Sequence, residues 1–172
     1  IEPIYIPVKT DVKMNDPDYS VQWHYHNTGQ GSGRKGIDIK LQEAWDQYGM
    51  FGNSNVIVAI LDSGVDYDHP DLAGNIWTNE AELNGKAGVD DDGNGYRDDV
   101  HGYNFVSGSA EIHPEDHGTH VAGTVGAVNN NGVGVCGVAG GRYPEKGVRL
   151  MCLQIMDATL PDKGASLAKV MQ

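Results

Sequence analysis

The sequence has few cysteines and few basic residues, and each shortage excludes a class of protein. Its two cysteines, Cys136 and Cys152, are too few for a disulfide framework and do not have Cys-x-x-Cys spacing. We therefore expect two buried, unpaired thiols. Lys and Arg number 12 against 24 Asp and Glu, which gives a formal charge of −12. A nucleic-acid partner is excluded, because phosphate binding depends on clustered basic side chains.

Long hydrophobic runs are also lacking. The longest run, Val56–Leu61, is far shorter than the ~20 apolar residues of a membrane-spanning helix, so the sequence predicts no transmembrane segment. The first residues do not form a secretion signal, and the chain does not begin with Met. We expect an upstream segment that was removed or that lies outside this chain. The length is that of one ordinary domain.

The hydrophobic pattern predicts an α/β fold. Residues 1–36 are rich in turn residues and are expected to form an extended N-terminal arm, with the domain itself over 37–172. Strands are predicted at 55–61, 103–106 and 148–155, and helices at 40–49, 119–128 and from 165 onward. The all-apolar run ending at Leu61 is typical of a central parallel strand covered on both faces. Because a few strands and a half-finished helix do not close a core, we expect the front part of a larger domain.

Two residues are candidates for chemistry. Asp62 follows an apolar strand, at the edge where α/β sheets usually build sites, although an Asp there can also simply begin a turn. His117 opens a segment with Gly118, and its imidazole could act as an acid and base or be purely structural. A third alternative is a zinc site on His113, His117 and His120. Pro114 and Gly118 argue against a helix across all three histidines.

Four motifs in order then resemble the subtilisin-like serine proteases. They are the segments Val58–Asp66, His69–Leu72, His117–Thr124 and Gly132–Ala139, and the residues from about 15 to 29 resemble the start of the bacterial mature enzymes. The resemblance implies a subtilisin-like parallel sheet flanked by helices, incomplete in this chain. It also implies a serine endopeptidase that cleaves proteins or peptides, with Asp62 as the triad aspartate and His117 as the general base.

The third member of such a triad is missing from these residues. The family's serine lies in a Gly-Thr-Ser-Met-Ala segment, and no Gly-Thr-Ser occurs here; Ser166 belongs to a predicted helix start. We therefore expect residues 1–172 alone to be inactive. The expected partner is the C-terminal part of the same catalytic domain, carrying the serine and the oxyanion asparagine, in a second chain or a following segment. A cleaved N-terminal propeptide is another expected partner. The alternative function is an inactive, protease-like, calcium-dependent interaction module.

The acidic segment beginning at Asp90 reads Asp-x-Asp-x-Asn-Gly, the first half of an EF-hand-like calcium loop. His101 stands where the closing glutamate would be, so Asp98 or Asp99 is expected to close the site. Five carboxylates this close together repel one another unless they are solvated or bind a cation, and a solvated loop is the alternative. The candidate ligands are Asp90, Asp92, Asn94, Tyr96, Asp98 and Asp99.

A second calcium site is implied only by the family resemblance. Its candidate ligands are the side chains of Asp16, Asp71 and Asn131 and the carbonyl oxygens of Asn129, Val133 and Val135. Such an ion would tie the irregular arm to the domain, with an ordinary polar turn as the alternative. Calcium and the family resemblance together predict a secreted or cell-surface protein of a bacterium.

Overall fold

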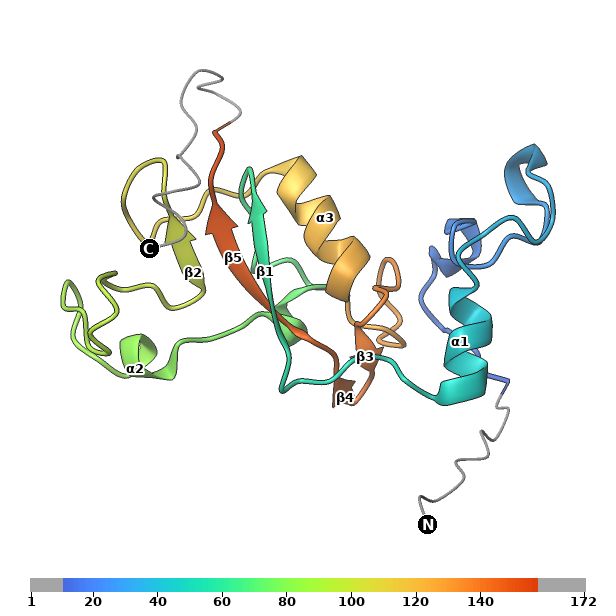
Figure 1. Cartoon of the computed structure of the whole chain (residues 1–172), viewed down its shortest axis with the longest axis horizontal. Helices are drawn as coiled ribbons and strands as arrows, with labels where there is room; N and C mark the ends of the chain where they lie inside the picture. The colour runs from blue at the N-terminus through green and yellow to red at the C-terminus, as the bar shows by residue number, and fades with distance from the viewer. Residues whose placement is uncertain (1–10, 158–172) are drawn as a thin grey trace, which may run out of the picture.

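The computed structural model describes residues 11–157. A three-stranded parallel sheet lies at its centre, the arm and helix α1 (Leu41–Tyr48) lie on one side, and helix α2 (Glu80–Leu83) lies on the other (Figure 1). The helix predicted from residue 165, including Ser166, lies outside the described residues. The α/β fold with a parallel sheet is confirmed.

The sheet has the strand order β1–β5–β2, with β1 at Ile57–Asp62, β5 at Arg149–Gln154 and β2 at Gly102–Asn104. The register places Asp62 opposite Gln154, and Asn104 opposite Gln154 from the other side. All three strands run parallel, so their carboxyl ends meet at one edge. This edge is where Asp62 ends β1.

Helix α3 (Asp116–Gly126) covers one face of the sheet, and Figure 1 shows it beside β1. Small residues on this helix, such as Ala122, allow it to approach the strands closely. The core between helix and sheet includes Ile60, Leu150 and Cys152, all of them buried. The burial of alternate strand residues on this side follows from the period of two in a strand.

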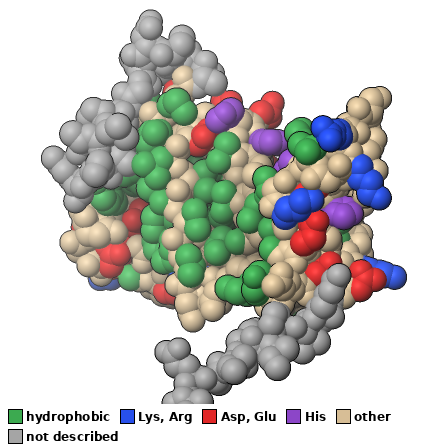
Figure 2. All heavy atoms as spheres, turned by 45° about the vertical axis from the view of Figure 1, so that its right-hand side comes forward, with side chains coloured by type: hydrophobic (Ala, Val, Ile, Leu, Met, Phe, Trp, Pro, Cys, Tyr) green, Lys and Arg blue, Asp and Glu red, His purple; other side chains and the backbone are tan. Residues whose placement is uncertain are grey.

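The other face of the sheet is exposed in the described residues. Ile57 and Leu61 of β1 are 42% and 39% exposed, and the alternate residues Met151 and Leu153 of β5 are only half-buried. The expectation of a central β1 covered on both faces is therefore wrong for this structure: β1 is an edge strand and β5 is central. Within residues 11–157 no second strand pairs with β1, and no described element packs on this face of the sheet. Figure 2 shows a broad hydrophobic area in the middle of one view of the molecule.

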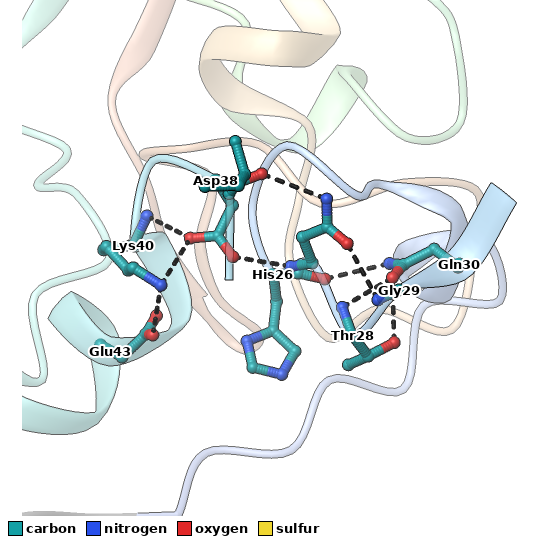
Figure 3. Close-up of polar contacts among 9 residues, drawn as sticks. His26, Thr28, Gly29, Gln30, Asp38, Lys40 and Glu43 are labelled. Atoms are coloured by element: carbon teal, nitrogen blue, oxygen red, sulfur yellow. Dashed lines mark hydrogen bonds and ion pairs between the residues drawn. The ribbon is translucent and has the colours of Figure 1, made fainter. Parts of the chain in front are cut away.

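The arm is ordered by its own hydrophobic cluster, in which Tyr25 and Trp45 are each 1% exposed and pack with Leu41 and Cys136. Figure 3 shows how it turns toward α1: Asp38 accepts the N–H groups of Asn27 and Lys40 at 2.8 and 2.9 Å, and its carboxylate faces the Lys40 ammonium. The arm therefore packs against α1 as a set of turns.

The remaining elements are short. They are the 3₁₀ turns Tyr19–Val21, Gln30–Ser32 and Ala73–Asn75, and the two-stranded hairpin β3 (Gly141–Arg142) and β4 (Glu145–Lys146). Sequence periodicity missed all of these, because a two- or three-residue element has no period. The longer predicted elements are confirmed with their ends shifted by one to three residues.

Candidate active site and acidic loops

Asp62 and His117 meet at the carboxyl edge of the sheet. His117 lies in the first turn of α3, and its Nδ1–H donates to Asp62 Oδ1 at 2.6 Å. An ionised carboxylate only accepts hydrogen bonds, so this contact places the imidazole proton on Nδ1 and leaves Nε2 as an acceptor. The Asp62 side chain is 10% exposed and that of His117 is 73% exposed. The imidazole of His117 is thus oriented by Asp62 and remains accessible to solvent.

The electrostatics of Asp62 favour its ionised form. Burial alone would raise the pKa of this carboxyl, but the hydrogen bonds from His117 and from the Ser63 N–H, at 2.7 Å, outweigh burial and lower the pKa. Asp62 therefore stays negative at neutral pH and can stabilise a positive charge on His117.

Two glycines allow the helix to reach the strand end. A Cβ on Gly118 would lie 2.1 Å from the Gly64 carbonyl oxygen, and one on Gly64 would lie 2.0 Å from that of His113. Gly64 also has φ +124°, a conformation that residues with a side chain rarely adopt. The Gly118 N–H faces Ser63 Oγ at 3.2 Å. Main-chain contact therefore sets the spacing between Asp62 and His117.

The structure does not support the zinc alternative. Within residues 11–157, the only group of three or more possible ligands with atoms close enough for one ion is Glu82, Asp90 and Asp92. His113 precedes α3, whereas His117 and His120 lie on it, and these rings form no such group.

Four of the predicted ligands from the arm and the domain do come together. Asp16 accepts the N–H groups of Asn130 and Asn131 at 2.7 and 3.2 Å, and Asp71 accepts the Asn131 side chain at 2.8 Å and the Val135 N–H at 2.9 Å. Burial raises the pKa of Asp71, and the charge of Asp16 adds to this. Within residues 11–157, no Lys or Arg forms an ion pair with either buried carboxylate, and such a pair of carboxylates fits a divalent cation.

The residues predicted to bind through their carbonyl oxygens differ in the contacts that they make. Val133 and Val135 follow Asn131 in the same loop, whereas the Asn129 carbonyl oxygen accepts the Tyr143 N–H at 2.9 Å. Asn129 is fully buried, and its side-chain Oδ1 accepts the Gly137 N–H at 2.7 Å. Asn129 therefore braces the loop as well as standing in the candidate ligand set.

The acidic loop folds around a residue that the motif did not include. Glu82 of α2 is buried and accepts the N–H groups of Asp91 and Asp98 at 2.7 and 2.8 Å. Its carboxylate also lies within 4.8 Å of those of Asp90 and Asp92. Glu82 was missed because it precedes the motif in sequence. Its position in a four-residue helix gave no periodic signal.

The carboxylate of Asp99, unlike that of Asp98, shares its hydrogen-bond donors with Asp92 of this cluster. Asn79 Nδ2 donates to Asp92 and Asp99 at 2.9 and 3.1 Å, and Asn94 donates to the same two carboxylates. Burial raises the pKa of Asp99. Asp98 instead accepts the Gly88 N–H with both oxygens at 2.9 Å. Of the other predicted ligands, Tyr96 packs its ring at a tilt against that of Tyr103 and donates its N–H to the Asn94 side chain.

Both cysteines are buried and unpaired, which confirms the expectation for the thiols. Burial raises the pKa of Cys152 to about 12. The pKa of Cys136 is also raised by burial, and its thiol donates to Asp16 at 3.2 Å. Both thiols are therefore protonated at neutral pH.

Comparison with known proteins identifies the family. The profile described as the Subtilase family matches residues 53–143, just over half of the chain, including both Asp62 and His117. The chain belongs to the subtilase family. The matched region contains the strand end and the first turns of α3 that form the site, so the family resemblance of the motifs is confirmed.

Among curated subtilases, the chain is similar to "Subtilisin-like protease 1" of Plasmodium vivax, with 43% identity over 130 residues. It is also similar to "Neuroendocrine convertase 2" of Homo sapiens, with 38% identity over 150 residues. These alignments cover 74% and 82% of this chain but 19% of each relative. The chain thus spans about a fifth of the length of the curated relatives it matches.

A solved structure also shares the subtilase fold. The Aeromonas sobria serine protease, in its complex with the chaperone ORF2, superposes with a TM-score of 0.65 at 24% identity, covering 99% of this chain and 25% of that one. At this identity the likeness concerns the fold alone. None of the helices in the described residues combines the length and hydropathy needed to cross a membrane.

Proposed function

We propose that this chain supplies the aspartate and histidine of a serine endopeptidase, and that the serine and the oxyanion asparagine come from a segment beyond residue 172, in the same polypeptide or in a second chain. The observation that carries the proposal is the 2.6 Å hydrogen bond between Asp62 and the Nδ1 of an otherwise exposed His117. On this proposal, residues 1–172 alone are inactive and the substrates are proteins or peptides.

The geometry supports a separate role for each of Asp62 and His117. Asp62 fixes the tautomer of His117 and stabilises the imidazolium, so that Nε2 can take the proton of a serine hydroxyl as it attacks the scissile carbonyl. The same Nε2–H then protonates the leaving amine, which completes acyl transfer to the serine. Water repeats both proton transfers in hydrolysis of the acyl-enzyme.

The test uses a polypeptide that contains this chain together with its downstream serine segment. A serine-directed phosphonate should label it, and His117→Ala should abolish labelling and peptide hydrolysis. Asp62→Asn should lower kcat by about 10⁴-fold, because the tautomer is no longer held. His113→Ala, an exposed histidine just before α3, is the matched control and should keep both signals.

The outcome against the proposal is an intact polypeptide with the downstream segment present, no phosphonate labelling and no hydrolysis. That result would favour the alternative of an inactive, calcium-dependent interaction module.

We also propose two calcium sites. Asp16 and Asp71 with Asn131, Asn129, Val133 and Val135 would hold one ion, and Glu82 with the 90–99 loop would hold the other. Supporting the first site is the burial of Asp16 and Asp71, which are 4% and 2% exposed. Calcium would supply positive charge that offsets their repulsion. Isothermal titration of the chelated protein with calcium should give two binding events, and magnesium should compete poorly.

A secreted or cell-surface location follows from the calcium proposal, because free calcium is abundant outside cells. A bacterial source stays a prediction: the curated relatives named above are from a parasite and a human, and the structural neighbour is from Aeromonas sobria. A cleaved propeptide likewise stays a proposed partner.

A further inference from the structure

The carboxyl edge of the sheet holds a buried amide side chain that the proposed mechanism does not use. Gln154 is the last residue of the central strand β5 and is 1% exposed. The strand register places it beside Asp62 of β1, and the Ile155 N–H donates to the Asp62 carbonyl oxygen at 2.9 Å. Burying an amide costs free energy unless its oxygen and its N–H groups find partners. The partners of Gln154 therefore indicate the role of this side chain.

Both polar atoms of the Gln154 side chain bind main-chain groups. Oε1 accepts the His113 N–H at 2.9 Å, and Nε2 donates to the Met156 carbonyl oxygen at 3.2 Å. Gly64 packs at the same place: a Cβ on this glycine would lie 2.0 Å from the His113 carbonyl oxygen and 3.3 Å from Gln154 Cδ. The main chain of His113 is thus held on two sides, by a hydrogen bond from its N–H and by contact of its carbonyl group with Gly64.

This held point lies close to the candidate general base, because only three residues separate His113 from His117. Pro114 is the first of them. Its ring fixes its own φ at about −65° and restricts the preceding residue to extended conformations, so the link is stiff. Glu115, the N-cap of α3, makes no capping hydrogen bond with its side chain. The entry of α3 is therefore restrained by the main chain of His113 rather than by a cap.

The imidazole of His117 depends on this entry. Its side chain is 73% exposed, and the 2.6 Å hydrogen bond to Asp62 is its one polar side-chain contact within residues 11–157. A ring held by a single hydrogen bond is placed mainly by its own main chain. That main chain is held after His117 by the Gly118 N–H, which donates to Ser63 Oγ at 3.2 Å, and before it at His113.

We infer that Gln154 is a positioning residue for His117. By holding the His113 main chain against Gly64, it fixes the entry of α3 and so the distance between the imidazole and Asp62. The inference rests on the proposed endopeptidase function.

A second buried amide at the same edge offers a matched comparison. Asn104 stands opposite Gln154 on β2, and its Nδ2 donates to the Glu111 carbonyl oxygen at 2.9 Å. It therefore holds the same connection two residues before His113. Ile112 lies between these two points and is anchored in the core, at 5% exposed. Loosening at Glu111 is stopped by Ile112, whereas loosening at His113 reaches α3.

The test uses the polypeptide with its downstream serine segment, and kcat is measured per site titrated with the phosphonate. Gln154→Met keeps the side-chain length and removes both hydrogen bonds. It should lower kcat about tenfold and change KM less than about twofold, because a misplaced base affects the chemical step rather than binding. The NMR resonance of the proton on His117 Nδ1, identified by its absence in His117→Ala, should shift or broaden. Asn104→Asp loses the donor to Glu111 and should lower the thermal midpoint while keeping kcat.

Two further variants test the hydrogen bond to His113 itself. In Gln154→Glu a carboxyl oxygen still accepts the His113 N–H, so kcat should stay within about threefold of the parent. Gln154→Asn keeps an amide that is one methylene too short to reach this N–H. It should reproduce the loss of kcat, and it takes the place of Gln154→Met if that variant does not fold.

The results that would overturn the inference differ in what else they overturn. Absence of phosphonate labelling and of hydrolysis in the parent polypeptide would remove the proposed function as well. With an active parent, a Gln154→Met or Gln154→Asn variant that loses thermal stability but keeps kcat and the Nδ1 resonance would make Gln154 a structural residue only. An equal loss of kcat in Gln154→Glu or in Asn104→Asp would show that the bond to the His113 N–H does not position His117.

Discussion

The two candidate calcium sites lie on opposite sides of the sheet and are built in opposite ways (Figure 1). The arm site joins residues 114 positions apart through the Asp16–Asn130 contact, and both of its carboxylates are buried. The acidic-loop site draws its candidate ligands from one stretch of chain, residues 82–99, and Asp92 is exposed there. A buried pair of like charges needs a counter-ion far more than a solvated group does.

The comparison also separates two roles for calcium. At the arm site an ion would stabilise a contact between distant segments, and so contribute to the free energy of unfolding of the whole domain. At the acidic loop it would order a local segment that already forms many hydrogen bonds to backbone N–H groups. We therefore expect the two sites to respond differently to the same charge change.

The largest expected effect is that of Asp71→Asn. With calcium at about 100 times its Kd, the variant should lose roughly 2.7 kcal/mol of stability, because the ion no longer stabilises the folded state. In a chelator it should lie within about 1 kcal/mol of the parent, since a buried repulsion with Asp16 is relieved. Urea unfolding with and without calcium measures both values. An equal loss in both conditions would contradict a cation at this site.

Glu82→Gln should have the next largest effect. The amide keeps one acceptor oxygen but loses the other, so at least one of the bonds from the N–H groups of Asp91 and Asp98 is broken. The expected cost is about 1–2 kcal/mol. Hydrogen exchange should locate the added opening at residues 82–99 and leave the arm unchanged. Increased exchange in the arm would contradict the expectation that Glu82 affects only the acidic loop.

The thermal midpoint of unfolding should depend on pH in both chelator and calcium. In chelator the change should be smaller and opposite in sign to the change in calcium. Asp71 and Asp99 have pKa values raised by burial above the ordinary 3.8, so their stabilising protonated form is lost as pH rises through the raised pKa. Without calcium, lowering the pH from 7 toward 4 should therefore raise the thermal midpoint. With calcium, protons compete with the ion and the midpoint should fall. Asp62, with a lowered pKa, weakens the fold only as pH falls below 3.8. Parallel curves in the two buffers would be inconsistent with both sites.

Asp98→Asn should have the smallest effect, below about 0.5 kcal/mol. Asp98 turns its carboxylate to the Gly88 N–H and has φ +58°, a conformation that Asn also tolerates. Calcium affinity of the acidic loop should be unchanged by titration calorimetry, whereas Asp99→Asn should weaken it. The reverse ranking of these two variants would show that Asp98 closes the site.

The pair Asp62 and His117 could be predicted because each lies in a local motif whose glycines are visible in the sequence. The acidic loop was predictable only in part. Choosing between Asp98 and Asp99 depends on which carboxylate turns inward, and that is decided by Asn79 and Glu82, which precede the motif. Tertiary contacts of this kind leave no periodic trace.

The strand β1 illustrates a different limit. Its apolar run correctly predicted a strand, but an apolar residue is equally compatible with burial by this chain and with burial by a segment that lies elsewhere. In residues 11–157, β1 therefore has a strand partner on one side only, and its Ile57 and Leu61 lie on an uncovered face of the sheet. The helix predicted over Lys40 to Gly49 was accurate because its amphipathic face is satisfied by the arm, within the described chain.

The backbone contact between Gly64 and Gly118 has a consequence for evolution and engineering. Because main-chain atoms touch there, the distance between the Asp62 carboxylate and the His117 imidazole does not depend on which side chains fill the core around α3. Substitutions at core positions such as Ala122 or Ile60 can change stability while the catalytic geometry is retained. A repacked core and an intact active site are thus separable properties of this chain, provided that Gly64 and Gly118 are kept.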